Sequence, residues 1–183
     1  MTTDKKDIER IMLTEREIHN KVAQIGHEIS EKYKDKDLLM VGILKGAFVF
    51  FSDLARSIEI PMAVDFMAVS SYGGDTQSSG VVRIMKDLDE PIEGKDVLIV
   101  EDILDTGHTL NYLLKVLNAR KPASISLCVL LDKYARREVP DIVPDFTGFK
   151  IENEFVVGYG LDYAEKYRNL PFIGILKPSV YED

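Results

Sequence analysis

Apolar runs alternate with amphipathic segments along most of the chain. Residues 38–44 and 124–131 are almost continuously apolar, which is typical of strands buried on both faces. Between such runs, apolar residues recur at helical spacing, as at 18, 22, 25 and 29 and again at 110, 113, 114 and 117. Further strands are expected at residues 62–69, 81–86, 97–100, 155–157 and 172–176. The alternation predicts an α/β fold with a mostly parallel sheet flanked by helices.

Charged residues follow several of the predicted strands. In open parallel sheets, ligands bind beyond the carboxyl ends of the strands, so residues at those ends gather along one edge. We expect this for Lys45 after 38–44, for 101–109 after 97–100, for Lys133 after 124–131, and for Asp162 after a fourth strand.

One of these junctions, VLIVEDILDTGHT at residues 97–109, carries most of the chemical information in the chain. An apolar strand ends in Glu101 and Asp102, and a turn containing Gly107 leads into an amphipathic helix. The free N–H groups and positive dipole of a helix N-terminus suit a phosphate, and glycine permits close backbone approach. The adjacent carboxylates would repel that phosphate, so we expect them to face ribose hydroxyls or Mg²⁺. A phosphorylated sugar satisfies both halves of the junction.

Length, charge and cysteine content narrow the class of protein. A chain of 183 residues predicts a single domain, 1–183, and a formal net charge of −8 disfavours binding to nucleic acid. Cys128, the only cysteine, lies in an apolar run and is expected to be a buried, inert thiol. The sequence shows neither a signal peptide nor an apolar run approaching ~18 residues, so we expect a cytoplasmic protein without membrane association.

The junction is similar to the phosphoribosyl-pyrophosphate (PRPP) signature of type I phosphoribosyltransferases. The surrounding motifs resemble the hypoxanthine-guanine branch of that family: LLMVGILKGAFVFFSDL, VDFMAVSSYG, LLDKY and EFVVGYGLDYAEKYRNLPFIG. The resemblance spans roughly residues 14–176. It implies the type I fold with a small hood, built from the N-terminal segment and about 133–172, and a mobile lid loop at about 70–80. The implied reaction is transfer of 5-phosphoribosyl from PRPP to N9 of a 6-oxopurine, in purine salvage.

The resemblance implies roles for the residues that would hold PRPP. The 5′-phosphate would be wrapped by Asp105, Thr106, Gly107, His108 and Thr109. Glu101 and Asp102 would face the ribose hydroxyls and a Mg²⁺ ion, which suits a site with few carboxylates and many ligand oxygens. Pyrophosphate would be contacted by Lys45, Gly46 and Arg168, with a cis peptide bond before Lys45. Asp162 would ligate a second Mg²⁺, usually through water.

Other positions acquire roles at the purine. Asp105 would be the general base, or the hydrogen-bond partner, for purine N7. Lys133 would donate to the exocyclic O6, Phe155 would stack on the base, and the Val156 backbone would meet its Watson–Crick edge, with Asp162 nearby. The implied lid carries Ser71 and Tyr72 at its tip, closing over the reacting centre to exclude water.

His108 is a departure from those relatives that have lysine at this position. We expect it to be tolerated because backbone donors do most of the phosphate binding, although its positive contribution falls above its pKa. Arg136 and Arg137 look like a solvated pair, with a role at a subunit interface as the alternative. Relatives are usually dimers or tetramers, and Val49, Phe50 or Met62 are candidate interface residues.

Two other functions remain open on the sequence. A regulatory protein that uses the same fold to sense PRPP is the first, although the pattern begins by about residue 14 and leaves no room for an N-terminal winged helix. A phosphoribosyltransferase that prefers xanthine is the second, since backbone carbonyls near the purine 2-position decide that preference. A lysine facing position 6 argues against adenine, whose amino group would leave the buried donor unpaired.

Overall fold

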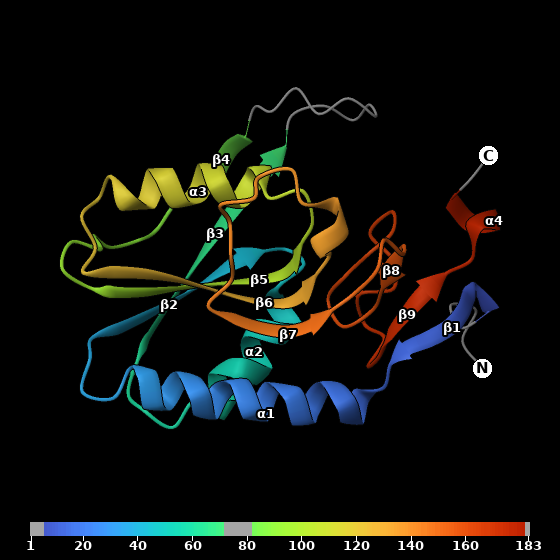
Figure 1. Ribbon diagram of the computed structural model, residues 1–183, viewed down its shortest axis with the longest axis horizontal. Helices are drawn as coiled ribbons and strands as arrows, with labels where there is room; N and C mark the ends of the chain where they lie inside the picture. Colours follow the sequence, from blue (N-terminus) through green and yellow to red (C-terminus); the bar gives the residue numbers. More distant parts are fainter. Residues whose placement is uncertain (1–5, 72–81, 182–183) are drawn as a thin grey trace.

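The computed structural model describes residues 6–71 and 82–181. The lid loop expected at about 70–80, including Tyr72, lies outside these residues except for its first two positions. The elements are β1 (Ile8–Leu13), α1 (Glu15–Lys32), β2 (Leu38–Leu44), α2 (Phe48–Ser57), β3 (Ala63–Ser71), β4 (Val82–Lys86), β5 (Asp96–Leu104), α3 (His108–Asn118), β6 (Ser124–Asp132), the 3₁₀ turn η2 (Tyr134–Arg136), β7 (Phe146–Lys150), β8 (Val156–Val157), β9 (Ile173–Leu176) and α4 (Pro178–Tyr181). Strands alternate with helices from β1 to β3, whereas β3, β4 and β5, and later β7, β8 and β9, follow one another directly (Figure 1).

The larger sheet has six strands in the order β4-β3-β2-β5-β6-β7. All neighbours in it run parallel except β3 and β4, which are antiparallel. This confirms the predicted α/β architecture. β7 was not anticipated as a strand: it is short, contains Gly148, and pairs with β6 at the sheet edge.

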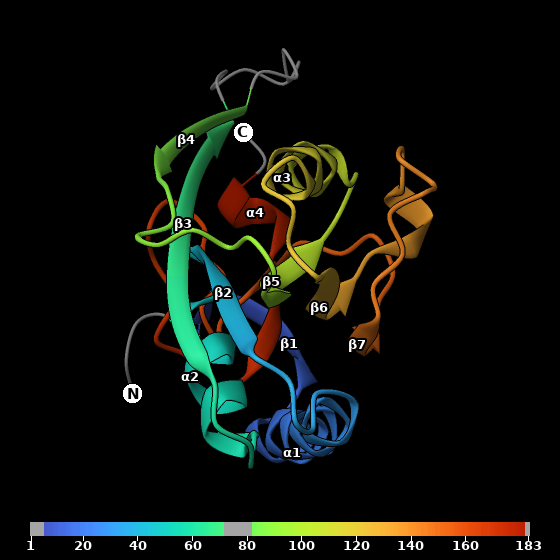
Figure 2. The same ribbon diagram turned by 90° about the vertical axis from the view of Figure 1, so that its left-hand side faces the viewer.

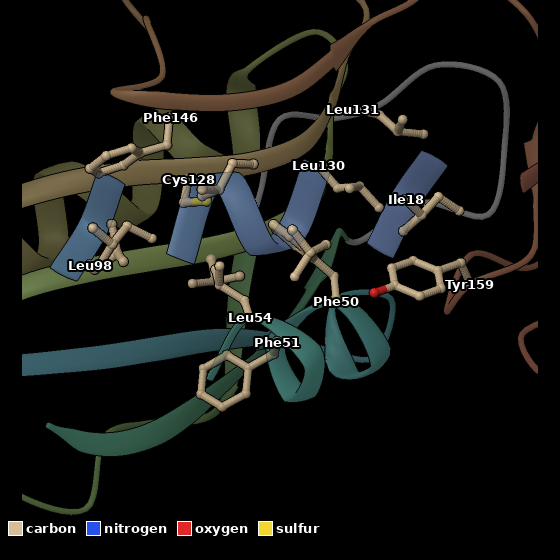
Figure 3. Packing of buried hydrophobic residues seen from close by; sticks show 14 of the residues in the cluster. Ile18, Phe50, Phe51, Leu54, Leu98, Cys128, Leu130, Leu131, Phe146 and Tyr159 are labelled. Atoms are coloured by element: carbon tan, nitrogen blue, oxygen red, sulfur yellow. The ribbon is translucent and has the colours of Figure 1, made fainter. Parts of the chain in front are cut away.

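Helices cover both faces of this sheet (Figure 2). On one face, α1 and α2 bury side chains against residues such as Leu98 and Leu130 (Figure 3). On the other, α3 packs against neighbouring positions of the same strands, such as Ile99 and Val129. Successive strand residues point to opposite faces, and both faces are covered, which explains the continuous apolar runs.

The start of α1 follows the sequence signal directly. The Thr14 hydroxyl accepts a hydrogen bond from the Glu17 amide at 3.3 Å, and the Glu17 carboxylate accepts one from the Thr14 amide at 2.8 Å. This capping box satisfies two amides that lack partners within the helix.

Phe50 is not an interface residue. It is fully buried, because positions 50 and 54 of α2 share the face that packs on the sheet. Val49 and Met62 are half-buried. Cys128, also fully buried, agrees with the expectation of a core thiol, and burial raises its pKa.

A second, antiparallel sheet in the order β1-β9-β8 forms the hood. Ile8 pairs with Leu176, so segments from opposite ends of the described chain lie side by side (Figure 1). The sequence predicts that Asp162 follows a strand of the parallel sheet, and this prediction is wrong. The strand that precedes Asp162, the short, β-branched β8, pairs antiparallel with β9 in the hood. β9 ends at Leu176, beyond the segment of about 133–172 that was expected to build the hood. No helix among the described residues is long and apolar enough to cross a membrane.

Candidate active site

The turn between β5 and α3 forms a small polar hollow. Gly107, at φ +92°, is the N-cap of α3, a backbone conformation that favours glycine. A cavity of about 110 Å³ lies here, lined by Glu101, Ile103, Leu104, Asp105, Thr106, Gly107, Thr109 and Leu110. Backbone amides and threonine hydroxyls at a helix N-terminus are suited to a phosphate. The structure thus brings Glu101 and the residues from Asp105 to Thr109 around one hollow, except that the side chain of His108 is not part of its lining.

Two carboxylates lie at this hollow: Asp102 is buried, and Glu101 is half-buried with its Oε2 atom inaccessible to solvent. Glu101 Oε2 has no hydrogen-bond partner among the described residues, and burial, with the nearby Asp102, holds the Glu101 pKa well above its usual value. Burial also raises the pKa of Asp102 from 3.8 to about 6, against the lowering effect of the 2.7 Å hydrogen bond from the Ile103 amide. Buried carboxylates without full pairing are costly, which indicates that a ligand completes this site.

Asp102 lies directly against the turn after β2. A Cβ atom built on Gly46 would be 1.6 Å from Asp102 Oδ2, so only glycine leaves this carboxylate in place. The preceding Leu44–Lys45 peptide bond is cis. Gly160 packs on the Gly46 carbonyl in turn, since its own Cβ would lie 2.2 Å from that oxygen. The ends of β5 and β2 thus meet the hood loop, residues 158–172 between β8 and β9, at one point.

The hood loop supplies one cation and another acid. Arg168 Nη2 lies 2.9 Å from Asp162 Oδ1, and Arg168 Nη1 donates to the Gly160 carbonyl at 2.8 Å. Arg168 Nε is buried without a partner among the residues described. Both Arg168 and Asp162 are near enough to affect the pKa of Asp102. These contacts group Gly46, Asp102, Asp162 and Arg168 into one charged cluster.

Glu165 links the two cations expected at pyrophosphate. Its Oε2 lies 3.2 Å from Lys45 Nζ and 3.5 Å from Arg168 Nη2, and the Lys45 ammonium lowers the Glu165 pKa. The backbone here is unusual: Ala164, Glu165 and Tyr167 all have positive φ angles. Strained non-glycine residues of this kind gather at functional sites.

At the other end of the hollow, Asp105 faces two cations. Lys133 Nζ is 3.9 Å from Asp105 Oδ2, and Arg136 Nε is 3.2 Å from Oδ1. Asp105 Oδ1 is buried, and among the described residues no donor has hydrogen-bond geometry toward it. Lys133 is only 7% exposed, and burial lowers its pKa, partly offset by Asp105. A partly exposed carboxylate beside a buried ammonium offers a ligand one hydrogen-bond acceptor and one donor.

Two hood residues expected at the purine come from the start of β8. Phe155 is 37% exposed and stacks on Tyr181, whereas Val156 is buried and pairs with Ile175. Glu154 is close enough to Lys133 to raise its pKa slightly, which places this end of the hood near the Asp105–Lys133 pair.

The interpretation of Arg136 and Arg137 as a solvated pair is wrong for Arg137, whereas Arg136 is exposed. Arg137 Nε donates to the Asp105 carbonyl at 3.1 Å, Nη1 donates to the Ile142 carbonyl at 2.6 Å, and Nη2 pairs with Asp132. A guanidinium offers five donors in one plane, enough to connect the turn between β5 and α3 (residues 105–107, the proposed phosphate turn) to the segment after β6. Nothing in the sequence distinguishes Arg137 from Arg136.

Sequence reasoning also missed Glu165 and Glu138. The carboxylate of Glu138 lies 2.7 Å from His108 Nε2, which gives the unusual phosphate-loop histidine a partner on its exposed side chain. The ion pairs of Glu165 depend on the folded hood loop, and the pairing of Glu138 depends on the segment after β6. Ser71 is the last residue of β3, and Tyr72 falls in the part of the chain outside the description.

Comparison with known proteins gives consistent matches. The family model described as phosphoribosyl transferase domain matches residues 10–164. The chain is 53% identical to hypoxanthine-guanine phosphoribosyltransferase of Bacillus subtilis, covering 97% of this chain and 98% of that protein. It is 51% identical to hypoxanthine phosphoribosyltransferase of Escherichia coli, over 90% of this chain and 93% of the relative. A crystal structure of a hypoxanthine phosphoribosyltransferase from Staphylococcus aureus superposes with a TM-score of 0.96 at 49% identity, covering 100% of this chain and 98% of the other.

Proposed function

This chain belongs to the phosphoribosyl transferase domain family, and we propose that it transfers 5-phosphoribosyl from PRPP to N9 of hypoxanthine or guanine. The products are IMP or GMP and pyrophosphate, and the reaction belongs to purine salvage. The observation that carries the proposal is the junction of β5 and α3. This junction combines a phosphate-sized hollow, the carboxylates of Glu101 and Asp102 and the Asp105–Lys133 pair along one strand end.

The PRPP end of the reaction is assigned to the strand ends and the hood loop. Backbone amides of residues 105–109 and the threonine hydroxyls bind the 5′-phosphate, while Glu101 and Asp102 face the ribose hydroxyls. The Lys45 amide, Gly46 and the Arg168 guanidinium hold pyrophosphate. Arg168 Nε, buried without a partner among the described residues, is a donor suited to a pyrophosphate oxygen.

Mg²⁺ fits the acidic part of this site. Glu101, Asp102 and Asp162 supply carboxylate oxygens, which Mg²⁺ prefers, and Glu101 Oε2 is buried without a partner in the described structure. Within residues 6–71 and 82–181, no three or more His, Cys, Asp or Glu side chains converge as a preformed metal cluster. When bound, Mg²⁺ neutralises the charge of the departing pyrophosphate.

At the base end, Asp105 accepts a proton from the purine and Lys133 donates a hydrogen bond to it. The C1′–N9 bond forms as the bond from C1′ to pyrophosphate breaks, and the proton on N7 passes to the Asp105 carboxylate. Lys133 donates to O6, so an amino group at this position would leave a buried donor unpaired. Phe155 stacks on the base, the Val156 backbone meets its edge, and Asp162 contributes nearby. Ser71 and Tyr72 belong to a lid that excludes water.

Measured turnover tests the reaction directly. Purified protein with PRPP and Mg²⁺ is offered hypoxanthine, guanine, xanthine and adenine separately, and product formation is followed by absorbance. We expect turnover with hypoxanthine or guanine, loss of it with EDTA, and none with adenine. Preference for xanthine would reassign the base. PRPP binding without turnover of any purine would indicate a PRPP sensor, and retention of nucleic acid in a gel shift would then identify its class.

Asp105→Asn isolates the proposed base. The amide keeps the shape of the carboxylate but accepts no proton, so kcat is expected to fall about 100-fold or more, the usual range for lost acid–base catalysis. PRPP affinity, measured by calorimetry, is expected to stay within about threefold because the phosphate loop contributes mainly backbone donors. Unchanged kcat would remove Asp105 from its assigned role.

We also propose that the protein assembles as a homodimer or homotetramer. An apolar cavity of about 500 Å³ lies on the surface between α2 and β3. Phe48 is 45% exposed and Val64 is 53% exposed at this face. Exposed apolar residues next to one another favour association with a matching surface.

A further inference from the structure

Three aromatic rings of the hood contact one another. Phe155 and Tyr181 are stacked, with ring centroids 4.6 Å apart and planes 18° from parallel. Tyr163 meets the Phe155 ring edge-on, at 5.6 Å and 85°. Phe155 directly precedes β8, Tyr163 lies in the hood loop, and Tyr181 is the last residue of α4, which follows β9 in Figure 1. Both geometries are favourable for aromatic pairs.

Tyr181 is held in place by the fold of the hood. The Val180 amide donates to the Lys177 carbonyl at 3.0 Å, and the Lys177 amide donates to the Asp7 carbonyl at 2.9 Å. Val180 and Tyr181 both pack against the buried hood cluster around Val157 and Leu176. The stacking partner of Phe155 therefore belongs to the packed structure.

Phe155 remains partly exposed despite these contacts. Tyr181 stacks on one face of the ring and Tyr163 meets the ring nearly at a right angle, yet the residue is still 37% exposed. A stack covers a single face of a ring, so a base that stacks on Phe155 would use the face opposite Tyr181. The backbone of Phe155 is fixed as well, because its carbonyl accepts the Leu176 amide at 2.9 Å. The arrangement presents a flat, supported aromatic surface.

We infer that Tyr181 is a positioning residue for the purine: it backs Phe155 so that the opposite face of that ring is already oriented to stack on the base. The inference rests on the proposed function, which places the purine on Phe155. Tyr181 itself does not touch the base. Its contribution is that the Phe155 ring loses little freedom when the purine binds, so the stacking interaction is obtained at lower entropic cost.

This role predicts a separation among kinetic constants. In Tyr181→Ala, KM for hypoxanthine and for guanine is expected to rise about twofold to tenfold, the factor that corresponds to an aromatic pair. Because stacking does not involve the edges of the base, both KM values rise by the same factor. KM for PRPP and kcat at saturating purine stay within about twofold of the unmodified protein.

Tyr181→Phe keeps the ring and is expected to restore the purine KM, whereas Tyr181→Leu keeps apolar bulk and is not. Tyr112→Ala is the matched control, since Tyr112 is also 37% exposed but lies on α3. Its purine KM should be unchanged. Thermal midpoints of all four variants separate loss of stability from loss of positioning, because destabilisation alone lowers the active fraction and leaves KM unchanged.

The same assays contain the outcomes that overturn the inference. Purine KM unchanged in Tyr181→Ala would remove Tyr181 from base binding, while a fall in KM would show that the tyrosine competes with the base. A rise in KM for PRPP of similar size would mean a general disturbance of the site. In each of these cases turnover by the unmodified protein leaves the proposed function standing. No turnover with any purine would overturn the proposed function and this inference together.

Discussion

The carboxylate of Asp102 lies so close to the Gly46 backbone that no side chain fits between them. Asp102 is also buried and carries a raised pKa of about 6. A single glycine thus determines where one of the proposed Mg²⁺ ligands lies, although it contributes no functional group of its own.

Gly46→Ala tests this geometry. The new methyl group would have to displace Asp102, and a shift of about 1 Å in a catalytic site costs on the order of 100-fold in rate. We expect a loss of kcat of that order, together with a higher Mg²⁺ concentration for half-maximal rate, both measured in the turnover assay.

Gly94→Ala is the control for Gly46→Ala. Gly94 has open space around it but a φ of +76°. It is expected to lower the free energy of unfolding by about 1 kcal/mol and to leave turnover unchanged. Equal activity of both variants would contradict the steric role of Gly46.

At the level of single residues, the sequence predicts those site features that depend only on the pattern of neighbouring residues. The phosphate turn and its acids follow from the strand–turn–helix pattern, and the structure places Glu101 and the main chain of residues 105–109 together. Glu165 was not predicted because its partner Lys45 is distant in sequence. Arg137 was not predicted because its contact with the distant Asp105 carbonyl exists only in the folded chain. A charged residue shows its role only when the fold supplies its counterpart.

Among the elements, the antiparallel pair β3–β4 depends on one buried carboxylate. Asp65 accepts hydrogen bonds from the Asp89 amide at 2.8 Å and the Phe66 amide at 2.6 Å, and it pairs with Lys86 at 3.1 Å. Burial alone would raise the pKa of Asp65, but these three donors outweigh it and hold the pKa below 3.8.

Asp65→Asn is expected to reduce the free energy of unfolding by about 1–3 kcal/mol at pH 7, since hydrogen bonds to a charged acceptor are lost. Because the folded pKa is lowered, the ionised carboxylate stabilises the fold above pH 4. This stabilisation disappears as the pH falls through the lower, folded value. Urea unfolding at pH 7 and at low pH should therefore show the difference between variant and parent shrinking with acid.

Asp89→Asn supplies the comparison for Asp65→Asn. The Asp89 side chain is 76% exposed and pairs with the same Lys86 at 3.2 Å. We expect a change within about 0.5 kcal/mol. A pH-independent deficit in Asp65→Asn would contradict the ionic origin of the effect.

The strands differ in how well their sequences indicated them. Long apolar runs such as β2 and β6 were predicted because burial on both faces leaves few polar positions. β1 (IERIML) and β7 (FTGFK) were not, since charged residues or glycine interrupt them and both are short. Their strand character depends on pairing with β9 and β6, an interaction that local propensity does not contain.

For the whole molecule, the described residues include an exposed apolar face on α2 and β3, around Phe48 and Val64. Val64→Glu places a charge there, and burying it in an interface would be costly. We expect the mass measured by light scattering to fall to that of a monomer. Val143→Glu changes a residue that is 74% exposed, away from that face, and should leave the mass unchanged. An unchanged mass for Val64→Glu would place any interface elsewhere.

The pairing of β1 with β9 joins residues about 160 positions apart, whereas β2, β5 and β6 find their partners much nearer in the sequence. Long loops close slowly and at greater entropic cost, so contacts between nearby segments form first. As the polypeptide folds, we therefore expect the parallel sheet with its phosphate turn to become ordered before the hood. A folding intermediate would then bind the sugar phosphate before it could bind the base, and the nucleobase pocket would be the last part to become ordered.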